Sequence, residues 1–168
     1  MKNKIKLIHT YDDLFIRNPN SLISTYILGH LQIEFLLVKI IEIHNANLYT
    51  FSLSLTHQKL IELAWGLKLI NSNQKKALLE INRIRNKLAH DITFTPSVKE
   101  IIDLYLLAQD AFSDMTDGIA QGLEELKGKE VITEEFEMYL SDFFSQVQYD
   151  LHGIYCEQGG HEYEFKSK

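Results

Sequence analysis

The sequence predicts an all-α protein, a bundle of four to five helices in a single domain. Hydrophobic residues make up 45% of its 168 residues, which is enough to build one core in a chain of this length. Only two prolines occur, so long stretches can form uninterrupted helices. Apolar residues recur at helical spacing through most of the chain, whereas the alternation typical of strands is weak. These observations favour helices packed in a bundle.

The first predicted helix covers residues 21 to about 45, with Ser21 as its N-cap. Apolar side chains occupy most of its circumference, which indicates a central helix packed on several sides. It also carries Lys39 and Glu42, and a membrane span tolerates such charges poorly. We therefore expect a core helix and no membrane association. Residues 45–54 are expected to form a loop.

Two further helices are predicted in the middle of the chain. Thr56 can cap the second, which runs to about residue 67. Polar residues 71–73 interrupt the helical pattern and can cap the next helix. The third helix is predicted from about residue 74 to residue 90, because apolar side chains recur there every three or four positions.

The C-terminal part is predicted to contain a long fourth helix and a separate last helix. Pro96 suits the first position of the fourth helix, which is expected to run to about residue 126. The last helix is predicted over about residues 133–157. The polar tail, residues 158–168, is expected to be mobile. The expected domain thus spans residues 1–168, with its core at about 20–126.

The net charge and the cysteine content limit the classes of function that fit this sequence. The net charge is -6, which argues against a general nucleic-acid-binding surface but leaves room for one local basic pocket. Two of the three arginines, Arg83 and Arg85, lie within one short segment. Cys156 is the only cysteine, so no disulfide can form within the chain, and this fits a reducing cytoplasm.

That arginine-containing segment, residues 81–91, is the most informative part of the sequence. Arg85 lies four residues after Ile81 and three before Leu88, so it falls on the helix face expected to contact the core. A buried arginine is costly unless it is paired. Arg85 is therefore out of place in a purely structural helix, unless it meets a partner such as Glu34.

Asn86 and His90 are four residues apart and share a helix face, whereas Arg85 and His90 are five apart, about 140° around the axis. A regular helix does not direct Arg85 and His90 at one atom. Two alternatives remain open: the helix ends or kinks before His90, or two chains pair so that the arginine of one approaches the histidine of the other.

Arg85, Asn86 and His90 are the candidate catalytic residues. Histidine titrates near neutral pH and can move the proton of a ribose 2′-hydroxyl. Arginine binds phosphate and stabilises developing negative charge, and asparagine can orient the histidine or donate to the phosphate. This chemistry requires no metal. In the alternative interpretation the three residues are structural, with the arginine bridging helices through a carboxylate.

Four residues are candidates for supporting roles. Arg83 and Lys87 can add positive charge for RNA, or simply form a solvated helix face. Asp91 can orient His90. Glu34, which shares a polar stripe with His30, can complete a pocket or be satisfied locally.

A possible zinc motif is also present but is weak. His152, Cys156 and His161 are ligand types that zinc accepts, yet only three ligands occur and a glycine pair separates two of them. We therefore predict no metal site and no cofactor.

Residues 84–90, Ile-Arg-Asn-Lys-Leu-Ala-His, resemble the signature of the HEPN superfamily, in which a histidine follows an arginine by four to six residues. The segment is similar to the form found in the mannitol-operon-repressor-like and related uncharacterised branches. Residues 59–70 resemble the second helix and turn of those branches, and residues 29–36 resemble the first helix. The resemblance covers roughly residues 20–115.

The resemblance implies a helical bundle that forms a homodimer, with the motifs of both copies near the interface. Many members are metal-independent endoribonucleases of toxin–antitoxin, abortive-infection or other antiviral defence systems, so RNA and an antitoxin or defence protein are the implied partners. Other members are non-catalytic regulators or protein-binding modules, which is the alternative. Toxins paired with a small nucleotidyltransferase often carry a tyrosine shortly after the histidine. Asp91 and the two residues after it do not match, which argues against that pairing.

Overall fold

The computed structural model describes residues 21–91, 93–163 and 165, and these residues form an all-α fold, as the sequence predicts. Seven α-helices and two short 3-10 helices occur in this part of the chain. In chain order they are α2 (Ser21–His44), η1 (Ala46–Leu48), α3 (Tyr49–Leu53), α4 (His57–Gly66), α5 (Ser72–His90), α6 (Val98–Gln109), α7 (Gly118–Leu126), η2 (Glu134–Phe136) and α8 (Glu137–Glu157).

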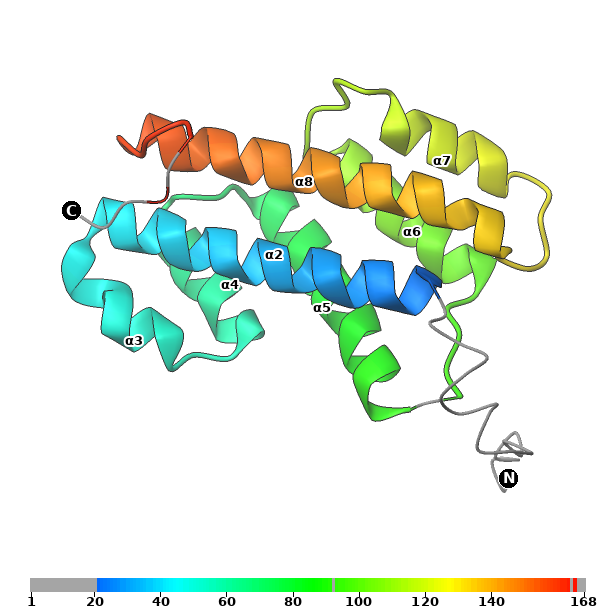
Figure 1. The fold of residues 1–168 in the computed structure, drawn as a ribbon, viewed down its shortest axis with the longest axis horizontal. Helices are drawn as coiled ribbons and strands as arrows, with labels where there is room; N and C mark the ends of the chain where they lie inside the picture. Colours follow the sequence, from blue (N-terminus) through cyan, green and yellow to red (C-terminus); the bar gives the residue numbers. More distant parts are fainter. Residues whose placement is uncertain (1–20, 92, 164, 166–168) are drawn as a thin grey trace.

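Helices α2 and α8 are the longest and lie side by side in the same direction (Figure 1). Hydrogen bonds between side chains mark their shared direction. The first joins Thr25 to Glu137, the next joins Gln148 to Gln32, and a third joins His44 to Gln158 at the far ends. Two parallel helices need a long connection, and helices α3 to α7 provide it. The predicted central helix is therefore confirmed.

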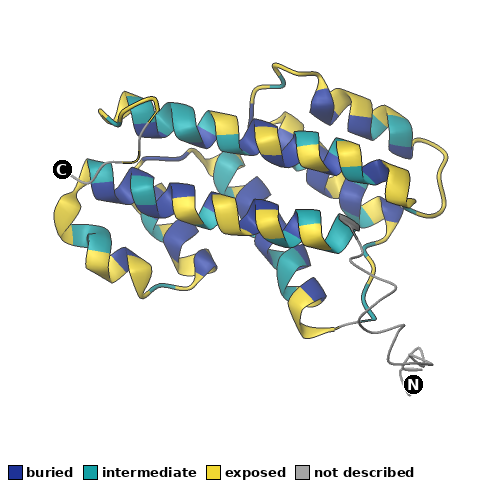
Figure 2. Cartoon of the chain, viewed as in Figure 1, coloured by how far each residue is buried: buried dark blue, intermediate teal, exposed yellow. Residues whose placement is uncertain are grey.

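The remaining helices complete the bundle behind this pair. Helix α2 contacts α4 and α5, α5 contacts α6, α6 contacts α7, and α7 returns to α8. Buried residues recur along every long helix in Figure 2, and they form one continuous hydrophobic core. None of the described helices is long and apolar enough to cross a membrane.

The predicted fourth helix is divided, which corrects the expectation of one helix over residues 96–126. It consists of α6 and α7, separated by residues 110–117. The carboxylate of Asp114 accepts hydrogen bonds from the backbone of Ile119 and Ala120, so it caps α7 from outside. Ser113 is held by Asp150 of α8, which fixes the intervening loop.

Helix α6 also begins differently from the prediction. Pro96 is not its first residue, because Ser97 is the N-cap. The Ser97 hydroxyl accepts from the backbone of Glu100, and the Glu100 carboxylate accepts from the backbone of Ser97. This reciprocal capping outweighs the preference of proline for a first helical position.

The segment from residue 45 to 54, expected to be a loop, is mostly helical. Asn45 accepts a hydrogen bond from the backbone of Asn47 and so caps η1, and α3 follows directly. The third predicted helix, α5, begins two residues early at Ser72, because Asn71 and Gln74 form a second reciprocal cap. The second and last predicted helices are present as α4 and as η2 followed by α8.

The described part of the C-terminal tail lies against the bundle. The backbone of Gly160 donates to the carbonyl of Tyr155, which turns the chain back after α8. The Phe165 ring is 5.0 Å from the ring of Phe35 on α2 and 5.2 Å from that of Tyr155 on α8. Aromatic contacts at these distances are favourable, so this tail, predicted to be mobile, has specific packing partners.

Candidate functional site

Helix α5 carries the candidate catalytic residues and continues through His90 without a break. Its buried residues Ile81, Ile84 and Leu88 fix its rotation against the core. Arg85 and Asn86 are half-buried, whereas His90 is exposed. The alternative in which the helix ends before His90 is therefore excluded.

Arg85 and Asn86 line a pocket between α2, α4 and α5. The pocket has a volume of about 410 Å³, and Glu34, His57 and Asn82 also line it. The guanidinium of Arg85 donates to the amide oxygen of Asn86 at 3.1 Å. Its Nε is buried and has no hydrogen-bond acceptor. Within the described residues Arg85 forms no ion pair, so its charge faces the pocket without a carboxylate bound to it.

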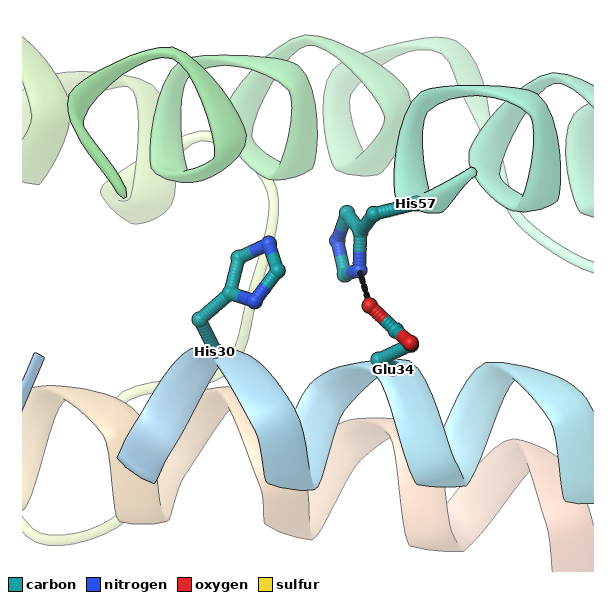
Figure 3. A group of neighbouring side chains, drawn as sticks. All are labelled: His30, Glu34 and His57. Carbon is teal, nitrogen blue, oxygen red and sulfur yellow. Dashed lines mark hydrogen bonds and ion pairs between the residues drawn. The ribbon is translucent and has the colours of Figure 1, made fainter. Parts of the chain in front are cut away.

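Two histidines meet beside this pocket (Figure 3). His30 on α2 is completely buried, and its ring centroid is 3.9 Å from that of His57, the first residue of α4. The Nε2 atom of His30 lies 3.3 Å from the amide oxygen of Asn82. The Nδ1 atom of His57 lies 3.3 Å from Oε2 of Glu34. These contacts connect three helices through polar side chains alone.

The charges of this cluster are set by its surroundings. Burial is the main cause that lowers the pKa of His30 to about 4, and the neighbouring His57 lowers it further. His30 is therefore neutral at pH 7. The hydrogen bond with His57 lowers the pKa of Glu34 and outweighs the opposing effect of burial, so Glu34 is a carboxylate.

Arg83 and Lys87, expected to support RNA binding, face helix α6 instead of the pocket. Arg83 forms ion pairs with Glu80 at 2.6 Å and with Glu100 at 3.3 Å, and Lys87 pairs with Glu100 at 2.9 Å. Burial raises the pKa of Glu100, but hydrogen bonds from Lys87, Ser97 and Arg83 lower it to about 2. Arg83 and Lys87 therefore belong to a solvated helix face, as in the alternative interpretation, and are paired there with carboxylates.

His90 and Asp91 lie at the end of α5, apart from the lining of the pocket. The carboxylate of Asp91 accepts hydrogen bonds from the backbone and hydroxyl of Thr93 at 2.9 and 2.7 Å, and these lower its pKa. Asp91 is thus directed at Thr93 and does not orient His90, contrary to the expectation. The side chain of His90 forms no hydrogen bond or ion pair with any described residue.

The structure adds residues that sequence reasoning did not select. Asn82 lies at a buried position of the motif helix, one turn before Asn86, and this spacing was a usable signal. His57 had no such signal, because its position beside His30 depends on how η1 and α3 return the chain to α2. His30 and Glu34 share one face of α2, as their spacing predicts, and this face is turned to the cluster.

The weak zinc motif near the C-terminus does not assemble. Cys156 lies 3.9 Å from the ring nitrogens of His152, whereas His161 accepts a hydrogen bond from the backbone of Tyr163. Among the described residues, one group of three side chains has the spacing of metal ligands, and it consists of His30, Glu34 and His57.

Comparison with known proteins gives no relative from which a function can be transferred. No protein-family model matches the chain, and neither a curated protein nor a solved structure matches it. The geometry of the pocket and the residues that line it are therefore the features from which a function can be inferred.

Proposed function

We propose that this protein is a metal-independent endoribonuclease of the HEPN type that acts as a homodimer. One observation carries the proposal. Arg85 is half-buried at a pocket, has a buried Nε–H without an acceptor, and forms no ion pair with a described carboxylate. Leaving such a donor unpaired costs about 1–3 kcal/mol. A phosphate in the pocket supplies both the acceptor and the opposite charge.

The pocket residues and His90 have separate roles in this reaction. Arg85 binds the scissile phosphate, and Asn86 fixes the orientation of the Arg85 side chain through their hydrogen bond. The 2′-hydroxyl loses its proton to a histidine base and attacks the phosphorus atom. The bond to the 5′-oxygen breaks, and that oxygen receives the proton that the histidine has taken up. The products are a 2′,3′-cyclic phosphate and a 5′-hydroxyl end, and no metal takes part.

The position of His90 requires a second copy of the chain. His90 is about 140° around α5 from Arg85 and about 7.5 Å further along the axis, so it is directed away from the pocket of its own chain. A homodimer in which α5 of each copy faces the other brings the exposed His90 of one to Arg85 of the other. Leu28, Leu31 and Phe35 form an apolar stripe on α2, exposed by 57%, 48% and 46%, and supply a surface for such pairing.

The substrate class follows from the pocket and the charge. The chain carries a net charge of -6, so the phosphate backbone of a duplex finds no broad basic surface. A single-stranded RNA segment or a tRNA loop can present one phosphate to the pocket. The proposed setting is a toxin–antitoxin, abortive-infection or antiviral defence system of the cytoplasm, with an antitoxin or defence protein as partner.

RNA cleavage in EDTA is the direct test of this proposal. Purified wild-type protein and His90→Ala are incubated with single-stranded RNA and total tRNA, and the new ends are analysed chemically. We expect wild type to leave 2′,3′-cyclic phosphate ends and the variant to be slower by about 10²–10⁴-fold, because it lacks the acid–base group. Equal cleavage by both proteins would contradict the role of His90.

A non-catalytic regulator or protein-binding module is the second candidate, and one observation favours it. Within one chain His90 does not line the pocket, and its side chain forms no hydrogen bond or ion pair with a described residue, so a monomer has no complete catalytic set. In this case the apolar stripe of Leu28, Leu31 and Phe35 binds a different protein. Absence of RNA cleavage by a confirmed homodimer would favour this candidate.

A further inference from the structure

The polar cluster beside the pocket contains three side chains with the spacing of metal ligands. His30 and Glu34 lie one turn apart on α2, and His57 approaches them from the first turn of α4 (Figure 3). One ligand atom from each residue lies within 4.8 Å of those of the other two. This arrangement does not depend on His90 or on any ribonuclease activity.

The hydrogen bonds among these residues leave nitrogen atoms unused. Nδ1 of His30 and Nε2 of His57 are both buried and have no hydrogen-bond partner. The two side chains are 0% and 6% exposed, so water does not readily satisfy them. A buried polar atom without a partner is uncommon in a folded protein and calls for a ligand or another functional explanation. Two such atoms on neighbouring rings, tilted by 34° to each other, leave each histidine with one nitrogen available to a ligand.

Asn82 prepares His30 for coordination. Its amide oxygen lies 3.3 Å from Nε2 of His30, so this nitrogen carries the proton and Nδ1 retains its lone pair. A metal-bound histidine usually donates its other ring N–H to an oxygen in this way, which fixes both tautomer and ring orientation.

The spacing of the three residues is close to that of ligands around an ion. Ligands of a tetrahedral zinc ion, bonded at about 2.0–2.2 Å, lie about 3.3–3.6 Å from one another. The ligand atoms that His30, Glu34 and His57 offer lie within 4.8 Å of one another, so small side-chain shifts bring them to this spacing. The hydrogen bond between Nδ1 of His57 and Oε2 of Glu34 leaves Nε2 as the ligand atom of His57. The carboxylate of Glu34 reduces the positive charge that an ion brings into this partly buried place.

We propose that His30, Glu34 and His57 form a binding site for a divalent transition-metal ion, with zinc as the best match. Two imidazoles and one carboxylate are a ligand set that zinc accepts while keeping a fourth position open. Glu34 and His57 line the pocket of about 410 Å³, so this fourth position opens toward Arg85 and Asn86. A water molecule or an anionic oxygen held by Arg85 completes the coordination.

The test measures metal binding directly and needs no RNA. Protein freed of metal with EDTA and then dialysed is titrated with Zn²⁺ in a calorimeter and with Co²⁺ in a spectrophotometer. We expect one ion per chain, a visible absorption band of four- or five-coordinate Co²⁺, and a rise in the melting temperature with Zn²⁺. Glu34→Gln and His57→Gln are each expected to weaken binding by at least about tenfold.

Matched controls separate this site from adventitious binding. Glu62→Gln makes the same carboxylate-to-amide change on α4 at a residue paired with Lys75, and is expected to bind the ion as wild type does. Cys156→Ser removes the only thiol and is also expected to leave binding unchanged. Circular dichroism confirms that each variant is folded. Absence of saturable binding in wild type, or equal affinity in Glu34→Gln and Glu62→Gln, would overturn the proposal.

Discussion

Replacement of Arg85 by alanine is expected to lower the rate of RNA cleavage by about 10²–10³-fold and to leave the melting temperature unchanged or slightly higher. The loss in rate follows because one preorganised donor to the developing negative charge contributes about that factor. The stability follows from its contacts, because Arg85 forms only the hydrogen bond to Asn86 and keeps a buried Nε–H without an acceptor. Residues retained for catalysis often reduce stability.

Arg83→Ala is the matched control for this variant. Arg83 lies two residues away on the same helix, but it is paired with Glu80 and Glu100. Its removal is expected to change cleavage little, since Arg83 does not line the pocket. Single-turnover cleavage rates and thermal melts are measured on both variants. A clear drop in the melting temperature of Arg85→Ala, with cleavage retained, would show that Arg85 has a structural role.

Gly29→Ala is expected to lower the free energy of unfolding by about 1–3 kcal/mol, because the added methyl group overpacks the core. Gly29 lies on α2 where this helix crosses the ring of Phe144 on α8, and a Cβ atom there would overlap the ring. Phe144 cannot move away easily, since its ring also packs edge-on against Tyr26 and Phe143. Close contact of the two parallel helices therefore depends on a glycine.

Gly153→Ala makes the identical change on α8 at a place where a Cβ atom meets nothing within 4 Å. It is expected to raise stability by up to about 1 kcal/mol, because alanine favours the helix over glycine by that amount. Urea denaturation of both variants gives the two free energies. If the free energy of unfolding changed in the same direction in Gly29→Ala and Gly153→Ala, the described packing of α2 on α8 would be contradicted.

Helices were predicted where the pattern of apolar and capping residues within one segment determines the structure. Helices α2 and α5 were predicted because apolar side chains recur along both at helical spacing, and Asn71 caps α5 from within the same segment. Ser21, predicted as the N-cap of the first helix, is instead the first residue of α2. The division between α6 and α7 was not predicted, since Asp114 and Ser113 act through contacts that the folded chain creates, including the one with Asp150. The helical conformation of residues 46–53 was missed because polar residues there also suit a loop.

The same distinction applies to the site. Arg85, Asn86 and Glu34 were predicted as site residues, and the structure brings all three to one pocket. An arginine on an apolar helix face can be recognised from the sequence of that one helix alone. The approach of His57 to His30 joins residues from α2 and α4, which are separated in the chain by η1 and α3, so no single segment contains it. The pairing of His57 with His30 becomes visible only when the positions of α2, α4 and α5 in the fold are known.

The two proposals concern neighbouring groups but are independent. In the ribonuclease proposal, cyclisation by the 2′-hydroxyl needs only Arg85, Asn86 and His90, so cleavage is expected in EDTA. In the metal proposal, the ion is held by His30, Glu34 and His57, of which Glu34 and His57 line the same pocket as Arg85. Cleavage measured in EDTA therefore tests the ribonuclease proposal alone, and metal affinity measured without RNA tests the metal site alone.

The central claim is that Arg85 of one copy works with His90 of the other, and mixed dimers test it most directly. Arg85→Ala and His90→Ala chains are inactive separately but are co-expressed with different tags. Half of the dimers are then mixed, and each mixed dimer has one intact site of two, so we predict about one quarter of wild-type cleavage. A mixture as inactive as its components would contradict a site shared between two chains.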